Sequence, residues 1–256
     1  MSNRRERRQA ERDAKKIDKN KKSFEMQMTL LQPWSVPVLQ SKLPPEILEA
    51  IIEISNDIIK DEKSISHGEH LAGQVDTELR VPHEFLHDAG IMNFFNGFCE
   101  QYIRVAKCQQ YPHETHLIQA EKLFIQMLTM WIVSQQPNEY NPIHVHTECQ
   151  LSCVMYLKVP KFLPSKKTHR NLDDGSITFI SNSPKDNEFG ATSLTVRPEV
   201  GDIFIFSAAQ QHSVYPYRCT EGDPERRSIS FNAIFETETD RKVNQEKIKL
   251  YDLKGL

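Results

Sequence analysis

The chain has 256 residues, of which 38% are hydrophobic and 26% charged, a composition typical of a globular protein with a substantial core. It contains no apolar run of about 18 residues that could span a bilayer, and no apolar segment of the secretory-signal type, so we expect no membrane attachment. The five cysteines are odd in number and form no CxxC pair. This favours reduced thiols and a cytoplasmic location, the host cytoplasm if the protein is viral.

Charge is distributed unevenly along the chain. Residues 1–22 contain ten Lys or Arg and four Asp or Glu, a net charge of +6 in a chain whose net charge is −3. We predict a disordered basic arm over residues 1–22, which either serves solubility alone or makes weak contact with a polyanion. The rest of the chain is acidic, which argues against a nucleic-acid-binding role for the protein as a whole.

Residues 23–122 are predicted to form a helical support region. Pro44 and Pro45 suit the first turn of a helix, and apolar residues then recur at roughly helical spacing from Ile47 to Ile59. A second helical stretch is predicted over about 83–106.

From residue 123 the sequence changes to short β-rich segments separated by turn residues. Such spacing predicts a β-sandwich or barrel with helices packed against it from the N-terminal half, a mainly β, α+β architecture. We place this β core at residues 123–236 and a polar C-terminal tail at 237–256. The predicted strands are 123–135, 149–159, 175–181, 193–198, 201–209, 212–217 and 226–235.

One candidate metal motif precedes the β core. His83, Glu84 and His87 match the HExxH pattern, which on a helix places two histidines one turn apart with a glutamate as base. Asn93 stands where the longer zinc-protease pattern has a third histidine, and Pro82 starts the helix at the motif itself. A zinc metallopeptidase is therefore an alternative, and a half-buried surface helix is the simpler interpretation.

A second candidate motif begins at His144 and His146. In an extended segment, residues two apart share a face, so both imidazoles are placed to bind one metal ion. A third histidine, His212, follows the apolar strand 201–209 and is expected at its far end. Each histidine alone has an ordinary structural explanation, but their order on consecutive β segments favours a shared site.

Glu148 is an alternative to His146 as the second of the three metal ligands. In extended geometry His144, His146 and Glu148 all face one way. Side chains at i and i+2 start about 7 Å apart and converge on one ion more easily than those at i and i+4, which favours His146. A carboxylate would offset the charge of a divalent cation, which favours Glu148. We expect His146 and leave Glu148 open.

The last predicted strand carries a candidate anion-binding surface. If the strand is extended, one face presents the polar side chains of Arg226, Ser228, Ser230 and Asn232. Arg227 then shares the opposite, apolar face, so Arg226 is the predicted anion ligand, because a guanidinium binds a carboxylate in two places at once. We expect this strand to be an antiparallel neighbour of the His212 strand.

These motifs together resemble the Fe(II)- and 2-oxoglutarate-dependent dioxygenases. Over about 123–236 the sequence is similar in particular to the 2OG-Fe(II) oxygenases common in bacteria and their phages, which are themselves similar to prolyl 4-hydroxylases. The resemblance is carried by the HxH, by LSCVMYLKVP at 151–160, by GDIFIF at 201–206 with HSVYPY at 212–217, and by RRSISFN at 226–232.

The resemblance implies a double-stranded β-helix, or jelly roll, with iron at its open mouth. It further implies Fe(II) ligands at His144, His146 and His212. Arg226, helped by Ser228, and Tyr156 would bind the distal carboxylate of 2-oxoglutarate. Where prolyl hydroxylases have aspartate, position 146 is histidine, which bears on the charge of the site.

The activity implied is that of an oxygenase that uses Fe(II), 2-oxoglutarate and O₂, releases succinate and CO₂, and hydroxylates a C–H bond. A protein side chain is the favoured substrate, ahead of nucleic acid or a small metabolite. A jelly-roll binding module without catalysis is the second alternative, beside the zinc peptidase.

Overall fold

A computed structural model describes residues 27–31, 36–88, 90–163, 174–181, 192–220 and 222–245. The basic arm predicted over residues 1–22 lies outside these ranges, as does most of the predicted C-terminal tail. Among the helices that are described, none is long and apolar enough to cross a membrane.

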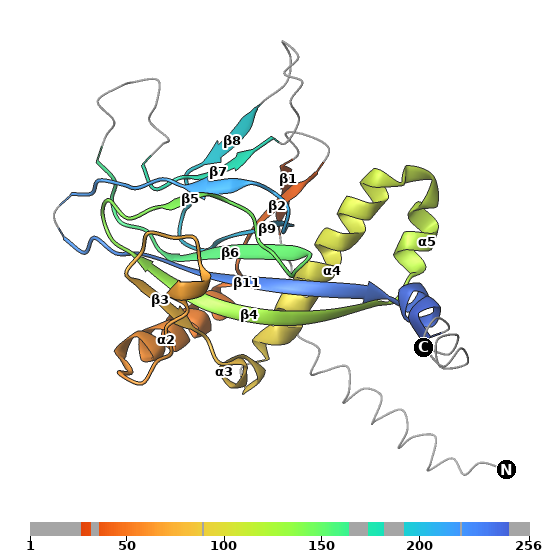
Figure 1. Cartoon of the computed structure of the whole chain (residues 1–256), viewed down its shortest axis with the longest axis horizontal. Helices are drawn as coiled ribbons and strands as arrows, with labels where there is room; N and C mark the ends of the chain where they lie inside the picture. The colour runs from red at the N-terminus through yellow and green to blue at the C-terminus, as the bar shows by residue number, and fades with distance from the viewer. Residues whose placement is uncertain are drawn as a thin grey trace, which may run out of the picture.

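The β core folds into two facing antiparallel sheets (Figure 1). Its strands are β4 (Leu123–Gln135), β5 (Asn141–His144), β6 (Leu151–Lys158), β7 (Ile177–Ile180), β8 (Ser193–Val196), β9 (Asp202–Ser207), β10 (His212–Val214) and β11 (Arg226–Thr237). The larger sheet contains the order β9-β6-β11-β4 and the smaller sheet the order β5-β10-β7-β8. Successive strands alternate between the sheets, except for the β7–β8 pair. This is the connectivity of a double-stranded β-helix, so the predicted fold is confirmed.

The N-terminal half supplies strands as well as helices. Strands β1 (Met28–Leu31) and β2 (Val38–Lys42) extend the larger sheet beyond β9, and β3 (Thr77–Arg80) pairs with β4 at its other edge. These strands are four or five residues long, too short for a clear alternating pattern in the sequence. With them the larger sheet has seven strands among the described residues, and β1 and β3 are its edge strands.

Proline and glycine mark the starts of the two longest described helices. Helix α2 (Pro45–Lys60) starts with proline in its first turn, as predicted. The stretch predicted over about 83–106 is divided at Gly90 into α3 (His83–Asp88) and α4 (Ile91–Gln110). Gly90 has a φ of 67°, a left-handed conformation that glycine adopts without a steric penalty. The remaining helical elements are η1 (Gly68–His70), η2 (Pro112–Glu114), α5 (Thr115–Ala120) and residues 238–245.

The strands of the larger sheet are buried on both faces. One face packs against α2 and α4 through side chains such as Ile51, Phe95 and Phe98, which meet Met155, Ile205 and Phe231 of the sheet. The other face packs toward the smaller sheet in a second cluster that includes Tyr156, Phe179, Phe204 and Phe206. Burial on both faces explains why β6 and β9 appear in the sequence as nearly continuous apolar runs, whereas β11 alternates between polar and apolar residues.

Candidate active site

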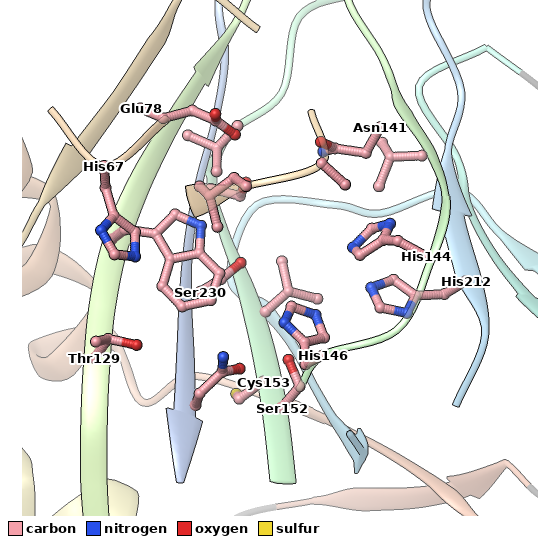
Figure 2. A pocket seen from close by; sticks show the side chains of 18 of the residues that line it. His67, Glu78, Thr129, Asn141, His144, His146, Ser152, Cys153, His212 and Ser230 are labelled. Atoms are coloured by element: carbon pink, nitrogen blue, oxygen red, sulfur yellow. The ribbon is translucent and has the colours of Figure 1, made fainter. Parts of the chain in front are cut away.

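A cavity of about 500 Å³ opens between the two sheets. Its floor is the inner face of the larger sheet, where Thr129, Trp131 and Val133 of β4 lie beside polar side chains of β11. Those side chains are Arg226, Ser228, Ser230 and Asn232, the four that side-chain alternation places on one face. The opposite wall, formed by β5, β10 and the residues after β5, carries three histidines (Figure 2).

The three histidines form one cluster. His144 ends β5 and lies directly across from His212, the first residue of β10. His146 follows two residues beyond β5, where its backbone N–H donates to the carbonyl of Ala208 at 2.9 Å. The ring centroids are 4.2 Å apart for His144–His212, 5.3 Å for His144–His146 and 5.2 Å for His146–His212. One ligand atom from each residue lies within 4.8 Å of the others, close enough to hold a metal ion.

Backbone carbonyl groups fix the orientation of two of these rings. Nδ1 of His144 lies 2.7 Å from the carbonyl oxygen of Pro142, and Nδ1 of His212 lies 2.9 Å from that of Gln210. A carbonyl oxygen only accepts, so the proton of each ring resides on Nδ1 and the lone pair on Nε2. Metal-binding histidines are commonly oriented by such a bond from the other ring nitrogen.

All three rings are held neutral. Burial, together with repulsion from its two neighbours, lowers the pKa of His212 well below its usual value. Burial and the proximity of His144 lower the pKa of His146 to about 4, and burial lowers that of His144. A histidine must be unprotonated to bind a metal, so at neutral pH the cluster is ready to act as a ligand set.

Glu148 does not join the cluster. The extended conformation ends at His144, and Glu148 has a φ of 59°, so the alternation that would align it with the histidines is lost. Its side chain is exposed at the rim of the cavity. His212 lies beyond the far end of β9, after a short turn, and begins β10, within the strand predicted over 212–217.

Arg226 is the buried cation of the cavity. It is 1% exposed, and its guanidinium donates to the carbonyl of Gly175 at 2.6 Å and to the side-chain oxygen of Gln135. Its Nε is buried and has no hydrogen-bond partner in the described part of the chain. A buried guanidinium with an unused donor, facing a cavity, is suited to an anionic ligand.

Tyr156 and Ser228 lie beside Arg226. They are paired directly across β6 and β11, and the Arg226 guanidinium lies 5.5 Å from the centre of the Tyr156 ring. The Tyr156 hydroxyl is buried without a partner among the described residues, and burial raises its pKa to about 12, so it remains a donor. Tyr156 and Arg226 thus present two unused donors to the same cavity.

One predicted relation between strands is wrong. The Arg226 strand was expected to be an antiparallel neighbour of the His212 strand, but β11 pairs with β4 and β6, whereas β10 pairs with β5 and β7. The jelly-roll connectivity sends β10 and β11 to opposite sheets. Arg226 and the histidines therefore face each other across the cavity.

Arg227 points to the opposite face of β11, as alternation predicts. It donates to both carboxylate oxygens of Glu225, at 2.7 and 2.8 Å, and to Ser55 and Asn56 of α2, at 3.0 and 2.6 Å. Lys158 and Ser134 also bond to Glu225, which lowers its pKa to about 2 against the opposing effect of burial. Arg227 therefore ties the sheet to α2 and takes no part in the cavity.

The sequence did not single out two residues that position Arg226. Gln135, which accepts from its guanidinium, is its direct partner across β4 and β11, a relation that only the register reveals. The Tyr217 hydroxyl accepts from the backbone N–H of Arg226 at 3.1 Å and lies 2.6 Å from the carbonyl oxygen of Gln135. Tyr217 belongs to the HSVYPY motif, which could have identified it.

The HExxH segment lies elsewhere. His83 and Glu84 of α3 line a separate cavity of about 650 Å³ together with Asp57 and Asp61. The side chain of His87 lies outside the described residues. Among the side chains that are described, the group that could hold a metal is the trio of His144, His146 and His212.

Comparison with known proteins agrees with the motifs. Residues 129–232 match the family model described as "Putative 2OG-Fe(II) oxygenase". No curated protein matches the chain.

Solved structures with a similar backbone arrangement include three prolyl hydroxylases. The enzyme from Pseudomonas putida is 14% identical with a TM-score of 0.42, covering 76% of this chain and 91% of its own. The enzyme from Trichoplax adhaerens, solved with a peptide fragment of hypoxia inducible factor, is 8% identical with a TM-score of 0.45, covering 81% and 84%. The collagen prolyl hydroxylase of Paramecium Bursaria Chlorella virus-1 is 13% identical with a TM-score of 0.41, covering 76% and 94%.

These TM-scores lie below 0.5, so the assignment depends on the family match and on the site itself. The matched segment contains the three clustered histidines and Arg226. Residues 129–232 are thus similar to the 2OG-Fe(II) oxygenases, the family that the sequence motifs resemble.

Proposed function

We propose that the chain is an oxygenase in which His144, His146 and His212 hold Fe(II) and Arg226 holds 2-oxoglutarate. The observation that carries the proposal is the pairing of these two groups across one cavity. Three neutral histidines face a buried arginine that has an unused donor. The products would be succinate, CO₂ and a hydroxylated substrate.

The residues present fit both groups. His144 and His212 direct Nε2 away from the backbone carbonyls that fix Nδ1, and the three ligand atoms come from one wall of the cavity. Arg226 and Tyr156 supply unpaired donors of the kind that a carboxylate needs. With O₂ as the oxidant, bound Fe(II) and 2-oxoglutarate would supply the oxidising chemistry, and the protein supplies orientation and exclusion of water.

A site with three histidines and no carboxylate has an electrostatic consequence. The usual iron site of this type has two histidines and a carboxylate, which offsets part of the metal charge. With histidine at 146 and Glu148 turned to the rim, the ligand set here is neutral. More positive charge then remains to attract 2-oxoglutarate, which is a dianion.

A protein side chain remains the favoured substrate, because the motifs resemble those of prolyl hydroxylases. We likewise propose a cytoplasmic location, which agrees with the five cysteines being free thiols. The basic arm remains a candidate for weak contact with a polyanion.

An anaerobic titration tests the proposal. Fe(II) and 2-oxoglutarate added together to the purified chain should produce a visible charge-transfer band, and neither should do so alone. A zinc peptidase or a binding module without a metal would give no such band. Absence of the band in a folded protein that contains one equivalent of iron would contradict the proposal.

A further inference from the structure

The cavity contains a buried carboxyl group that the proposed reaction does not use. Glu78 lies on β3, at the edge of the larger sheet, and is 3% exposed although it lines the cavity. Figure 2 shows Glu78 across the cavity from the three histidines. It therefore needs a role other than binding the metal.

Glu78 lacks a partner within the part of the chain that the structure describes. Its Oε2 is buried and accepts no hydrogen bond, and no described Lys, Arg or His nitrogen lies within ion-pair distance. Arg226, the buried cation of the same cavity, is engaged with Gly175 and Gln135. Burial, with a contribution from Glu139, raises the pKa of Glu78 to about 7. An unpaired carboxylate in this position is costly until a partner arrives.

Strand register separates Glu78 from the 2-oxoglutarate ligands. Glu78 is directly opposite Val133, Val133 opposite Ser228, and Ser228 opposite Tyr156. Glu78 is therefore two strands away from Ser228 and three from Tyr156, about 10 Å and about 14 Å for an inter-strand spacing of about 4.8 Å. Its negative charge would also repel 2-oxoglutarate, so it serves a different ligand.

Two glycines lie close to the carboxyl group. A Cβ atom on Gly73 would lie 2.9 Å from Oε1 of Glu78, and one on Gly68 would lie 3.3 Å from Oε2. The chain from His67 to Gly73 thus passes so close to the carboxyl group that a side chain at Gly73 would displace it.

An aromatic side chain, Trp131, lies between His67 and the histidine cluster in the same cavity. Trp131 is two residues from Val133 on the same strand, is 3% exposed and lines the cavity. Its ring centroid is 5.5 Å from that of His67 and 6.1 Å from that of His146. An indole and a carboxylate that line one cavity are a combination that attracts organic cations.

We propose that Glu78 selects a substrate with a positively charged nitrogen, an amine or guanidinium of the kind found on lysine and arginine side chains. The nitrogen pairs with the Glu78 carboxylate, and the carbon chain of the substrate passes Trp131 toward the histidines. This assignment of a substrate class depends on the proposed function. It favours a basic side chain over an anionic or purely apolar one.

Peptide pairs that differ only in charge test the proposal. The probes are acetyl-Gly-Xaa-Gly-amide peptides in which Xaa is lysine or norleucine, and arginine or citrulline. Calorimetry of the full chain, anaerobic and loaded with Fe(II) and 2-oxoglutarate, should show each charged peptide binding at least about tenfold more tightly than its neutral counterpart. Glu78→Gln should abolish this difference. Glu53→Gln, an exposed acid on α2, should keep it.

Equal affinity within each pair, no binding of any peptide, or a charge preference that persists in Glu78→Gln would overturn the proposal. The pairs are compared first in the unaltered chain, so the result does not depend on the folding of a variant. If the charge-transfer band does not form but the preference is present and requires Glu78, the oxygenase proposal fails while the cation site stands. If the charge-transfer band forms and the charge preference is absent, the cation-site proposal fails while the oxygenase proposal stands.

Discussion

Arg226 and Arg227 are adjacent in the sequence but have opposite surroundings, so they form a matched pair for mutation. Arg226 is 1% exposed, lines the cavity and has an Nε without a hydrogen-bond partner among the described residues. Arg227 is also buried, but its guanidinium is engaged with Glu225 and with α2. Replacing each by alanine removes the same atoms from the two faces of one strand.

We expect Arg226→Ala to weaken 2-oxoglutarate binding and Arg227→Ala to lower the stability of the fold. Arg226→Ala removes the charged partner of a buried carboxylate, which costs about 2–5 kcal/mol of binding and so weakens 2-oxoglutarate binding at least about 30-fold. Arg227→Ala leaves the cavity intact, so the 2-oxoglutarate Kd should stay within about threefold. The Arg227→Ala substitution removes the bidentate partner of Glu225, but Glu225 still accepts hydrogen bonds from Lys158 and Ser134. We therefore expect the free energy of unfolding to fall by about 1–3 kcal/mol.

The assay is the 2-oxoglutarate Kd from anaerobic titration of the charge-transfer band, with chemical denaturation measured in parallel. Arg226→Ala also leaves Gly175 and Gln135 without a donor, so Arg226→Lys serves as a milder variant that keeps the charge but loses the planar fork. Equal effects of the two alanine variants on Kd, or a larger effect at Arg227, would refute the assignment of Arg226.

Three further predictions concern the metal, the basic arm and pH. His212→Ala should abolish Fe(II) binding and 2-oxoglutarate turnover in a folded protein, whereas His83→Ala and His87→Ala should retain both; the reverse outcome would favour the peptidase. Deletion of residues 1–22 should leave succinate formation unchanged, and a truncated chain that fails to fold would contradict this. Because the pKa of Glu78 is raised to about 7 in the folded state, its ionisation destabilises the protein as pH rises from about 4.5 to 7. Glu78→Gln should therefore raise Tm at pH 8 and change it little at pH 5, and an equal rise at both values would count against the burial of an unpaired carboxylate.

Side-chain alternation was sufficient to predict much of the site. The strand containing Arg226 is extended throughout, so alternate residues reach opposite faces and the polar face meets the cavity. Alternation failed at Glu148, because β5 ends at His144 and Glu148 has a left-handed backbone conformation, which nothing in the local residue types indicates. The rule is therefore reliable only within a strand.

Which strands pair with one another could not be predicted from the sequence. Placing His212 and Arg226 in opposite sheets requires the jelly-roll connectivity, which no local pattern contains. The same holds for Gln135, which meets Arg226 through register, and for Glu78, which enters the cavity only because β3 pairs with β4. Short edge strands of this kind carry too few residues for a periodic signal.

The most direct test of the site is anomalous diffraction from crystals grown without oxygen in the presence of Fe(II) and 2-oxoglutarate. A single iron peak should lie among the side-chain nitrogens of His144, His146 and His212, with the distal carboxylate of 2-oxoglutarate against Arg226. An iron peak at His83 and His87, or one bound by Glu148 in place of His146, would contradict the account.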